Sequence, residues 1–172
     1  STATPVGVLR AAEHWAAQVT QAERDIAVEG LLDLPLDGDT WIRAVRVEAV
    51  DEPRLISHVL EALPATSRQQ ERQALASAIS CRPLRQVEAR RSLVEVIEAL
   101  LALDKAGDFR IACSLVSSLG EGHRGGRRLR DAFARAATEG GHRIPLADAS
   151  AFEAVGIRPP KSSFEAPKRS TS

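Results

Sequence analysis

Four arginines and one histidine lie between positions 123 and 130 around a glycine-containing loop. They are His123, Arg124, Arg127, Arg128 and Arg130, and we call them the basic corner. A helical apolar pattern begins after the glycine pair 125–126, so exposed backbone N–H groups are expected beside the guanidinium groups. Such an arrangement can hold a phosphate or an acidic segment of a partner protein. The sequence therefore predicts a site for a partner or an anion here.

A mobile, solvated loop without a ligand is the competing interpretation. Arg127 and Arg128 stand in the expected first helical turn, where the helix dipole disfavours cations by about 0.3–1 kcal/mol. The glycines destabilise the turn further. Anion binding is one function that would account for a helix start of low stability here. A phosphate loop of the nucleotide-binding kind needs a preceding strand, which this stretch lacks.

The remaining residues with reactive side chains form no recognisable motif. The four histidines lack paired or HExxH spacing, so no metal site is expected: His14, His58, His123 and His142. No Ser, Cys or His stands in a known nucleophile motif, and we assign no catalytic residue and no cofactor. An enzyme whose site is assembled only in space remains an alternative.

Charge is balanced overall and uneven along the chain. The sequence has 23 Lys plus Arg and 23 Asp plus Glu. Residues 1–52 carry four Arg against ten acids, whereas residues 120–172 carry ten Arg plus Lys against six acids. The two ends either attract each other or create a basic face. Nucleic-acid binding is thus an alternative, although net neutrality and an aromatic content of 3% argue against it.

Composition also bears on compartment and source. The cysteines Cys81 and Cys113 lie in or beside apolar helical segments and are expected to be small core residues in a reducing compartment. No apolar run is long enough to span a membrane, so we expect a cytoplasmic protein. The excess of Arg over Lys, 20 to 3, is typical of a GC-rich bacterial genome. The absence of Met suggests a piece of a larger protein.

The apolar residues have helical spacing almost throughout. The segment 92–119 is the most apolar and predicts an αα-hairpin with a break at 105–107. Scarce aromatic residues predict a core of Leu, Val, Ile and Ala. Further helices are expected at 5–26, 51–63, 66–79, 108–119, 127–139 and 150–157. The first of them is expected to end before Gly30, and the last to have Ser150 as its cap. The helix that ends at 101 begins either near residue 83 or at Ser92.

Two parts of the chain do not follow this pattern simply. Residues Leu34–Val47 fit either a helix or a β-hairpin, and we favour the helix for the reason given next. Residues 159–172 are rich in Pro, Ser and charge, as disordered segments are. We therefore predict an all-helical domain at 1–158 and a disordered tail or linker at 159–172.

An internal similarity supports a helical array. A shift of 56 residues aligns the segment starting at Asp51 with that starting at Gly107, and the segment around Trp41 then aligns with the helix around Ile97. The sequence thus predicts an all-α fold of seven to eight helices, in a short repeat array or bundle of two echoing units. Chance similarity between amphipathic helices is the alternative.

These features favour a non-catalytic module that binds another protein, as part of a larger bacterial regulatory or effector protein. The basic corner and the groove between helical units are the expected contact surfaces. The regular apolar seam of the first helix offers a homodimer contact as an alternative.

Overall fold

The computed structural model describes residues 21–33, 68–70, 72–73, 76, 84–85 and 87–167. Its α-helices are α2 (Gln21–Leu32), α6 (Val87–Ala102), α7 (Ala106–Leu115), α8 (Gly126–Gly140) and α9 (Ala149–Val155). The 3-10 helices are η2 (Val116–Leu119), η3 (Leu146–Asp148) and η4 (Lys161–Ser163). The described residues contain no strand, and a single β-bridge joins Ile144 to Phe164. The predicted all-helical class is confirmed for this part of the chain.

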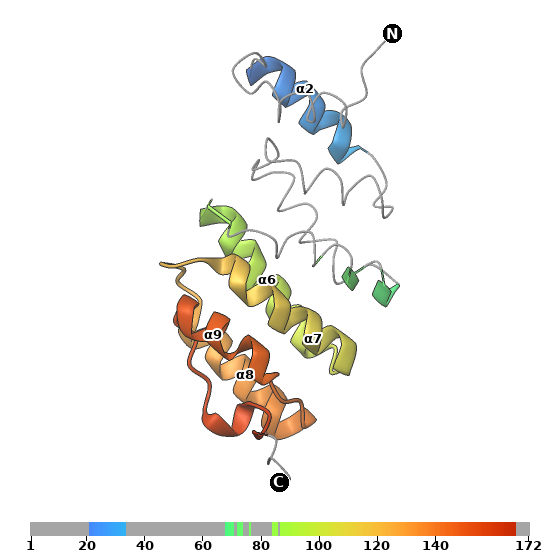
Figure 1. Ribbon diagram of the computed structural model, residues 1–172. Helices are drawn as coiled ribbons and strands as arrows, with labels where there is room; N and C mark the ends of the chain where they lie inside the picture. Colours follow the sequence, from blue (N-terminus) through green and yellow to red (C-terminus); the bar gives the residue numbers. More distant parts are fainter. Residues whose placement is uncertain are drawn as a thin grey trace.

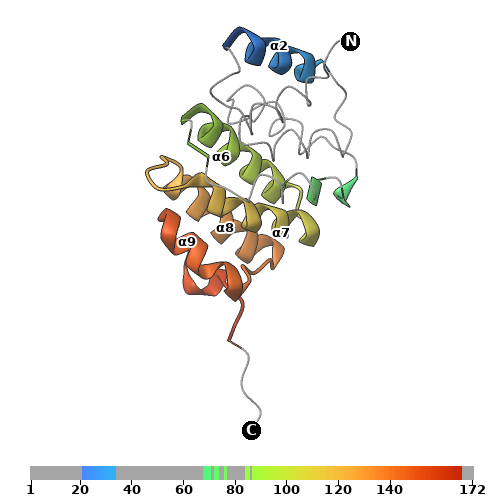
Figure 2. The ribbon, with the colours of Figure 1, turned by 45° about the horizontal axis from the view of Figure 1, so that its top comes forward.

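The described helices from α6 onward are stacked against one another. Helix α6 contacts both α7 and α8, while α9 packs on η2 and α8 packs on η4. Figures 1 and 2 show the same succession, with α6 and α7 beside each other and α8 and α9 beyond them. The helix at 51–63, the segment Leu34–Val47 and the first of the two echoing units lie outside the described residues.

Helices α6 and α7 form the predicted αα-hairpin. The buried side chains of α6 recur every three or four residues: Ala89, Leu93, Val94, Val96, Ile97 and Leu100. The hairpin turns between Ala102 and Ala106, within which Asp104 adopts a φ of 53°. Helix α6 runs unbroken through Ser92, so a restart at that residue is wrong.

Several predicted helix ends are confirmed and others are not. Helix α8 ends at Gly140, and Gly141 follows in the left-handed conformation with a φ of 70°. Helix α9 begins at Ala149, so Ser150 lies inside the helix and is not its cap. Helix α2 continues through Gly30, where the sequence predicted a break. A single glycine costs a helix about 1 kcal/mol, and that is too little to end one on its own.

The core of the described region is more aromatic than expected. All four phenylalanines of the chain lie in one edge-to-face row: Phe109, Phe133, Phe152 and Phe164. The ring centroids in this row are 6.0, 4.9 and 6.0 Å apart. The expectation of a purely aliphatic core is therefore wrong here, because few aromatic residues suffice when they meet at one place. Aliphatic side chains such as Leu93 and Ile97 belong to the same core cluster as these rings, as predicted.

Residues 159–167 differ from the predicted disordered tail. Ile144 donates its N–H to Ser163 O at 2.8 Å, and Glu165 donates its N–H to Ile144 O at 2.9 Å. Ser163 is buried, and Phe164 packs against the core. The packed region thus extends past the predicted boundary at 158, because one aromatic side chain anchors a segment of otherwise polar composition. Residues 168–172 lie outside the described part.

This ordered segment also affects ionisable groups beneath it. Burial raises the pKa of Asp148, and the nearby carboxylate of Glu165 raises the pKa further. Burial likewise raises the pKa of the Cys113 thiol, with Asp148 as a second cause. Cys113 is a free, buried thiol, which confirms its prediction as a small core residue. Cys81 lies outside the described residues.

A buried ion pair ties residue 72 to the hairpin. Arg72 Nε and Nη2 donate to the two carboxylate oxygens of Asp108 at 3.0 and 3.3 Å. The side chains are 8% and 0% exposed. Such a pair is stabilised by its bidentate geometry and is costly to break, because removing either partner leaves the other charge buried without its bidentate contact. No local pattern in the sequence predicts this contact.

Candidate functional site

The loop of the basic corner is held in place by side chains from two directions. His123 accepts the Gly125 N–H at Nδ1 over 3.2 Å, so its Nε2–H donates to Val155 O at 2.6 Å, at the end of α9. Arg90 of α6 donates to Glu121 O at 3.0 Å. His123 is half-buried and positions the loop between α6 and α9. Its two ring nitrogens are thereby occupied within the chain.

The four arginines of the basic corner divide into two pairs. Arg128 forms an ion pair with Glu98 of α6, and Arg130 forms one with Asp131 at 3.0 Å. Arg124 and Arg127 are exposed, and neither has an ion-pair partner among the described residues. The structure places Arg127 and Arg128 in the first turn of α8, as predicted, and no side chain caps this turn. An anion site at Arg124 and Arg127 stays a prediction.

Gly125 is required by close packing. It is buried at the start of α8, and a Cβ built on it would stand 2.7 Å from Val94 Cγ2 and 3.1 Å from Val94 Cγ1. Val94 is β-branched and sits in α6, where its χ1 is nearly fixed. The glycine therefore lets the α8 loop approach α6 closely, a physical role different from the weakened turn that the sequence suggested.

We expect Gly125→Ala to lower the free energy of unfolding by about 1–3 kcal/mol, because the added methyl group overpacks the contact with Val94. The same substitution should cost less in a Val94→Ala background, where the methyl group has room. A double-mutant cycle in urea measures this coupling, which should be at least about 0.5 kcal/mol. An equal cost in both backgrounds would rule out the steric explanation.

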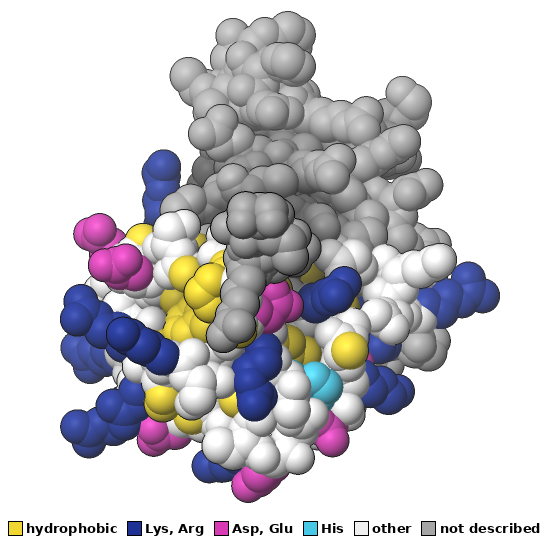
Figure 3. All heavy atoms as spheres, turned by 60° about the horizontal axis from the view of Figure 1, so that its bottom comes forward, with side chains coloured by type: hydrophobic (Ala, Val, Ile, Leu, Met, Phe, Trp, Pro, Cys, Tyr) yellow, Lys and Arg dark blue, Asp and Glu magenta, His cyan; other side chains and the backbone are white. Residues whose placement is uncertain are grey.

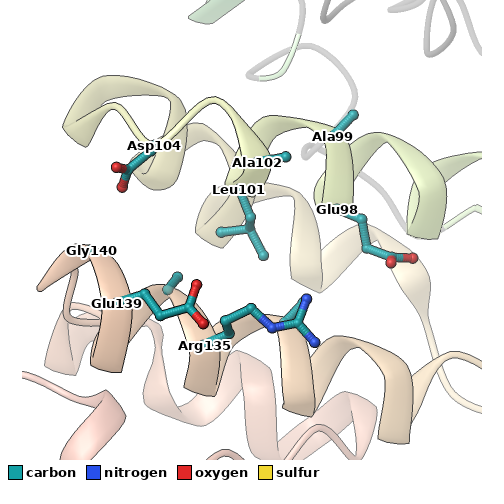
Figure 4. Close-up of a pocket in the computed structure, with 10 residues that line it drawn as sticks. Glu98, Ala99, Leu101, Ala102, Asp104, Arg135, Glu139 and Gly140 are labelled. Carbon is teal, nitrogen blue, oxygen red and sulfur yellow. The ribbon is translucent and has the colours of Figure 1, made fainter.

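A groove between α6 and α8 is a feature that the sequence did not predict. It has a volume of about 520 Å³ and opens to solvent. Its lining residues are Glu98, Ala99, Leu101, Ala102, Asp104, Ala132, Arg135, Ala136, Glu139 and Gly140. Figure 4 shows Leu101 pointing from α6 into this space, with Arg135 and Glu139 extending from α8. We call it the α6–α8 groove.

Small residues create the groove. Ala132, Ala136 and Gly140 follow one another at four-residue intervals on α8, so they share one face of that helix. Ala99 and Ala102 line the side of α6. Larger residues at these positions would fill the space between the helices. This spacing was visible in the sequence, although the sequence alone did not show that the two alanine faces oppose each other.

Polar contacts fix the groove at both ends. Glu98 pairs with Arg128 at one end. At the other, His142 Nε2 lies 2.8 Å from Asp104 Oδ1, and the His142 ring stacks on Phe109 with centroids 5.2 Å apart. A Cβ at Gly140 would stand 2.5 Å from Asp104 Oδ1 and 2.7 Å from His142 Cδ2, so a larger residue there would have to displace this contact. The two helices are thus held apart at a defined spacing.

The lining residues offer apolar contact and ion pairing. Three carboxylates (Glu98, Asp104 and Glu139) and one guanidinium (Arg135) line the groove together with small apolar groups. None of these lining residues is a Ser, Cys or His, so the groove contains no activated nucleophile of the usual kinds. Within the described part of the chain, no group of three or more His, Cys, Asp or Glu residues is placed to hold a metal ion.

Charges are mixed on the face shown in Figure 3. Lys and Arg side chains are scattered over the edge and the middle of its described area, Asp and Glu side chains lie between them, and hydrophobic side chains gather towards the middle. This face therefore lacks the continuous basic stripe that usually accompanies nucleic-acid binding.

Comparisons with protein-family models, curated proteins and solved structures found no match for this chain. None of the described helices is long and apolar enough to cross a bilayer.

Proposed function

We propose that this protein is a non-catalytic binding module whose α6–α8 groove holds a segment of another protein. The observation that supports the proposal is the groove itself, about 520 Å³ of open space between two helices. Apolar side chains form its floor and charged side chains its rim, as in protein–protein interfaces. Leu101 on this floor is only partly buried, so a partner could bury it further.

Rigid helices make the groove suitable for docking. Helix α6 packs on α7 and α8 through fully buried side chains such as Leu93, Ile97 and Leu100. The contacts at both ends of the groove hold its width. A preformed surface binds with a smaller ordering cost than one that must rearrange.

Site-specific crosslinking tests this proposal. A photoreactive phenylalanine at Ala132 would stand in the groove, and the same residue at Ala154, exposed on α9, is the matched control. We expect the Ala132 probe to capture a partner in source cells that the Ala154 probe does not capture. The purified partner should then bind the wild-type chain and lose affinity for Ala136→Phe, which fills the groove. Equal capture by both probes, or equal binding by Ala136→Phe, would contradict the proposal.

Anion or nucleic-acid binding at the basic corner is the second candidate. It is supported by the exposed Arg124 and Arg127 at a helix start without a side-chain cap. This candidate predicts salt-sensitive binding of labelled duplex or single-stranded nucleic acid that Arg124→Glu/Arg127→Glu abolishes. Binding that is unaffected by this double variant would exclude the corner.

The wider predictions from sequence stay proposals as well. We propose that the helices belong to a two-unit array of a cytoplasmic, bacterial protein. The homodimer through the first helix also stays a proposal, and the 73% exposure of Ile26 leaves one apolar side chain of α2 available for such a contact.

A further inference from the structure

We propose that the segment bound in the α6–α8 groove is a basic amphipathic helix of a partner protein. Its Arg or Lys side chains would lie with their aliphatic stems on the alanine floor and their charged groups against Asp104 and Glu139. This inference rests on the proposed function and specifies the chemistry of the partner.

The charge of the groove supports this choice. Its lining has three carboxylates and one guanidinium. Glu98 and Asp104 have partners in Arg128 and His142, but the Asp104 side chain is still 70% exposed. Glu139 is exposed and has no ion-pair partner among the described residues. A cationic segment finds acceptors here, whereas an acidic segment would meet repulsion.

The helix dipoles also favour a cationic partner. Helix α6 ends at Ala102 and α8 ends at Gly140, and both residues line the groove. Their carbonyl ends therefore lie at the same end of the groove, beside Asp104 and Glu139, as Figure 4 shows. Neither helix carries a basic residue in its last turn. The end of α8 already has a cation from outside the helix, because Arg143 Nη1 donates to Ala137 O at 2.7 Å. The end of α6 therefore remains the one that favours a cation supplied by a partner.

The floor suits the stem of a long basic side chain. Ala99, Ala102, Ala132 and Ala136 offer apolar surface without filling the space. Arg and Lys side chains bury their methylene groups on such surfaces and keep the charged group at the rim. Leucines of the same partner helix can contact Leu101, which is partly buried.

Fluorescence anisotropy with synthetic peptides on the full chain tests the inference. The probe is a helical peptide of about four turns, with leucines on one face and arginines on both flanks. A second peptide has glutamates in place of the arginines. The variants are Glu139→Arg and Ala136→Phe, and their matched controls are Glu153→Arg and Ala154→Phe on exposed positions of α9. Circular dichroism verifies that each variant is folded.

We expect the arginine peptide to bind and the glutamate peptide to bind at least about tenfold more weakly. Glu139→Arg and Ala136→Phe should each weaken the arginine peptide by about tenfold, and the α9 controls should leave it unchanged. Failure of the arginine peptide to bind at about 1 mM overturns the inference. Preferential binding of the glutamate peptide that Ala136→Phe abolishes would also overturn it, yet would leave the groove as a docking site. An affinity for the peptide that is the same in the wild-type chain and in Ala136→Phe would contradict the proposed function itself.

Discussion

Replacing Asp108 with alanine is expected to lower the free energy of unfolding by about 3–5 kcal/mol. The substitution removes the carboxylate that pairs with two nitrogens of the Arg72 guanidinium, whose side chain is 8% exposed. For a chain of this size, each kcal/mol lowers the melting temperature by about 2–4 °C, so the expected fall is about 10 °C. Thermal and urea unfolding followed by circular dichroism measure the effect.

Two controls separate the buried charge from other effects of the Asp108→Ala change. Glu88→Ala removes an exposed acid from the first turn of α6 and should cost less than about 1 kcal/mol, the scale of a dipole contribution alone. The double variant Arg72→Met/Asp108→Leu removes both charges and should be more stable than Asp108→Ala. A double variant that is less stable than Asp108→Ala would show that the buried charge of Arg72 is not what makes the single substitution costly.

Phe133→Ala is the second substitution with a large expected effect, a loss of about 3–5 kcal/mol. Phe133 is fully buried and contacts the rings of both Phe109 and Phe152, so its removal leaves a cavity at the centre of the aromatic row. Urea unfolding should show a lower midpoint at an unchanged slope, as expected for a loss of stability alone.

The control for Phe133→Ala retains most of the volume at this site. Phe133→Leu should cost less than about half as much, because the cavity is smaller. Arg135→Ala, on an exposed position of the same helix, should change stability by less than about 0.5 kcal/mol. Similar losses for Phe133→Ala and Arg135→Ala would contradict the account of the core.

Local patterns in the sequence predict most of the described helices. The three-and-four spacing of Leu93, Ile97 and Leu100 reports a buried helix face directly, and Gly141 marks the end of α8 because its conformation favours glycine. Capping was predicted less well. Ser150 and Glu153 have the spacing of a capping box, yet η3 precedes α9 and shifts the helix start to Ala149.

Contacts between distant residues could not be predicted in the same way. Arg72 and Asp108 are 36 residues apart, and neither has a neighbour in sequence that indicates an ion pair. The same holds for Glu98 and Arg128, which pair across two helices. Local charge density therefore suggested a four-arginine site, although two of the four guanidiniums have partners in the fold.

The groove and the ordered 159–167 segment show the same limit. Nothing in the sequence around Ala132, Ala136 and Gly140 indicates a groove. The groove exists because Ala99 and Ala102 of α6 lie opposite them. Phe164 lies in a polar segment, and that segment is ordered by the contact of its ring with Phe152 and by backbone hydrogen bonds to Ile144. Both features depend on how elements meet in space, which composition does not report.

The central claim is that a partner protein binds in the α6–α8 groove. The most direct measurement is the change in amide NMR shifts when the labelled chain is titrated with the partner captured through Ala132. We predict that the largest changes fall at residues 98–104 and 132–140. Changes confined to residues 121–130, or spread evenly over the chain, would contradict the claim.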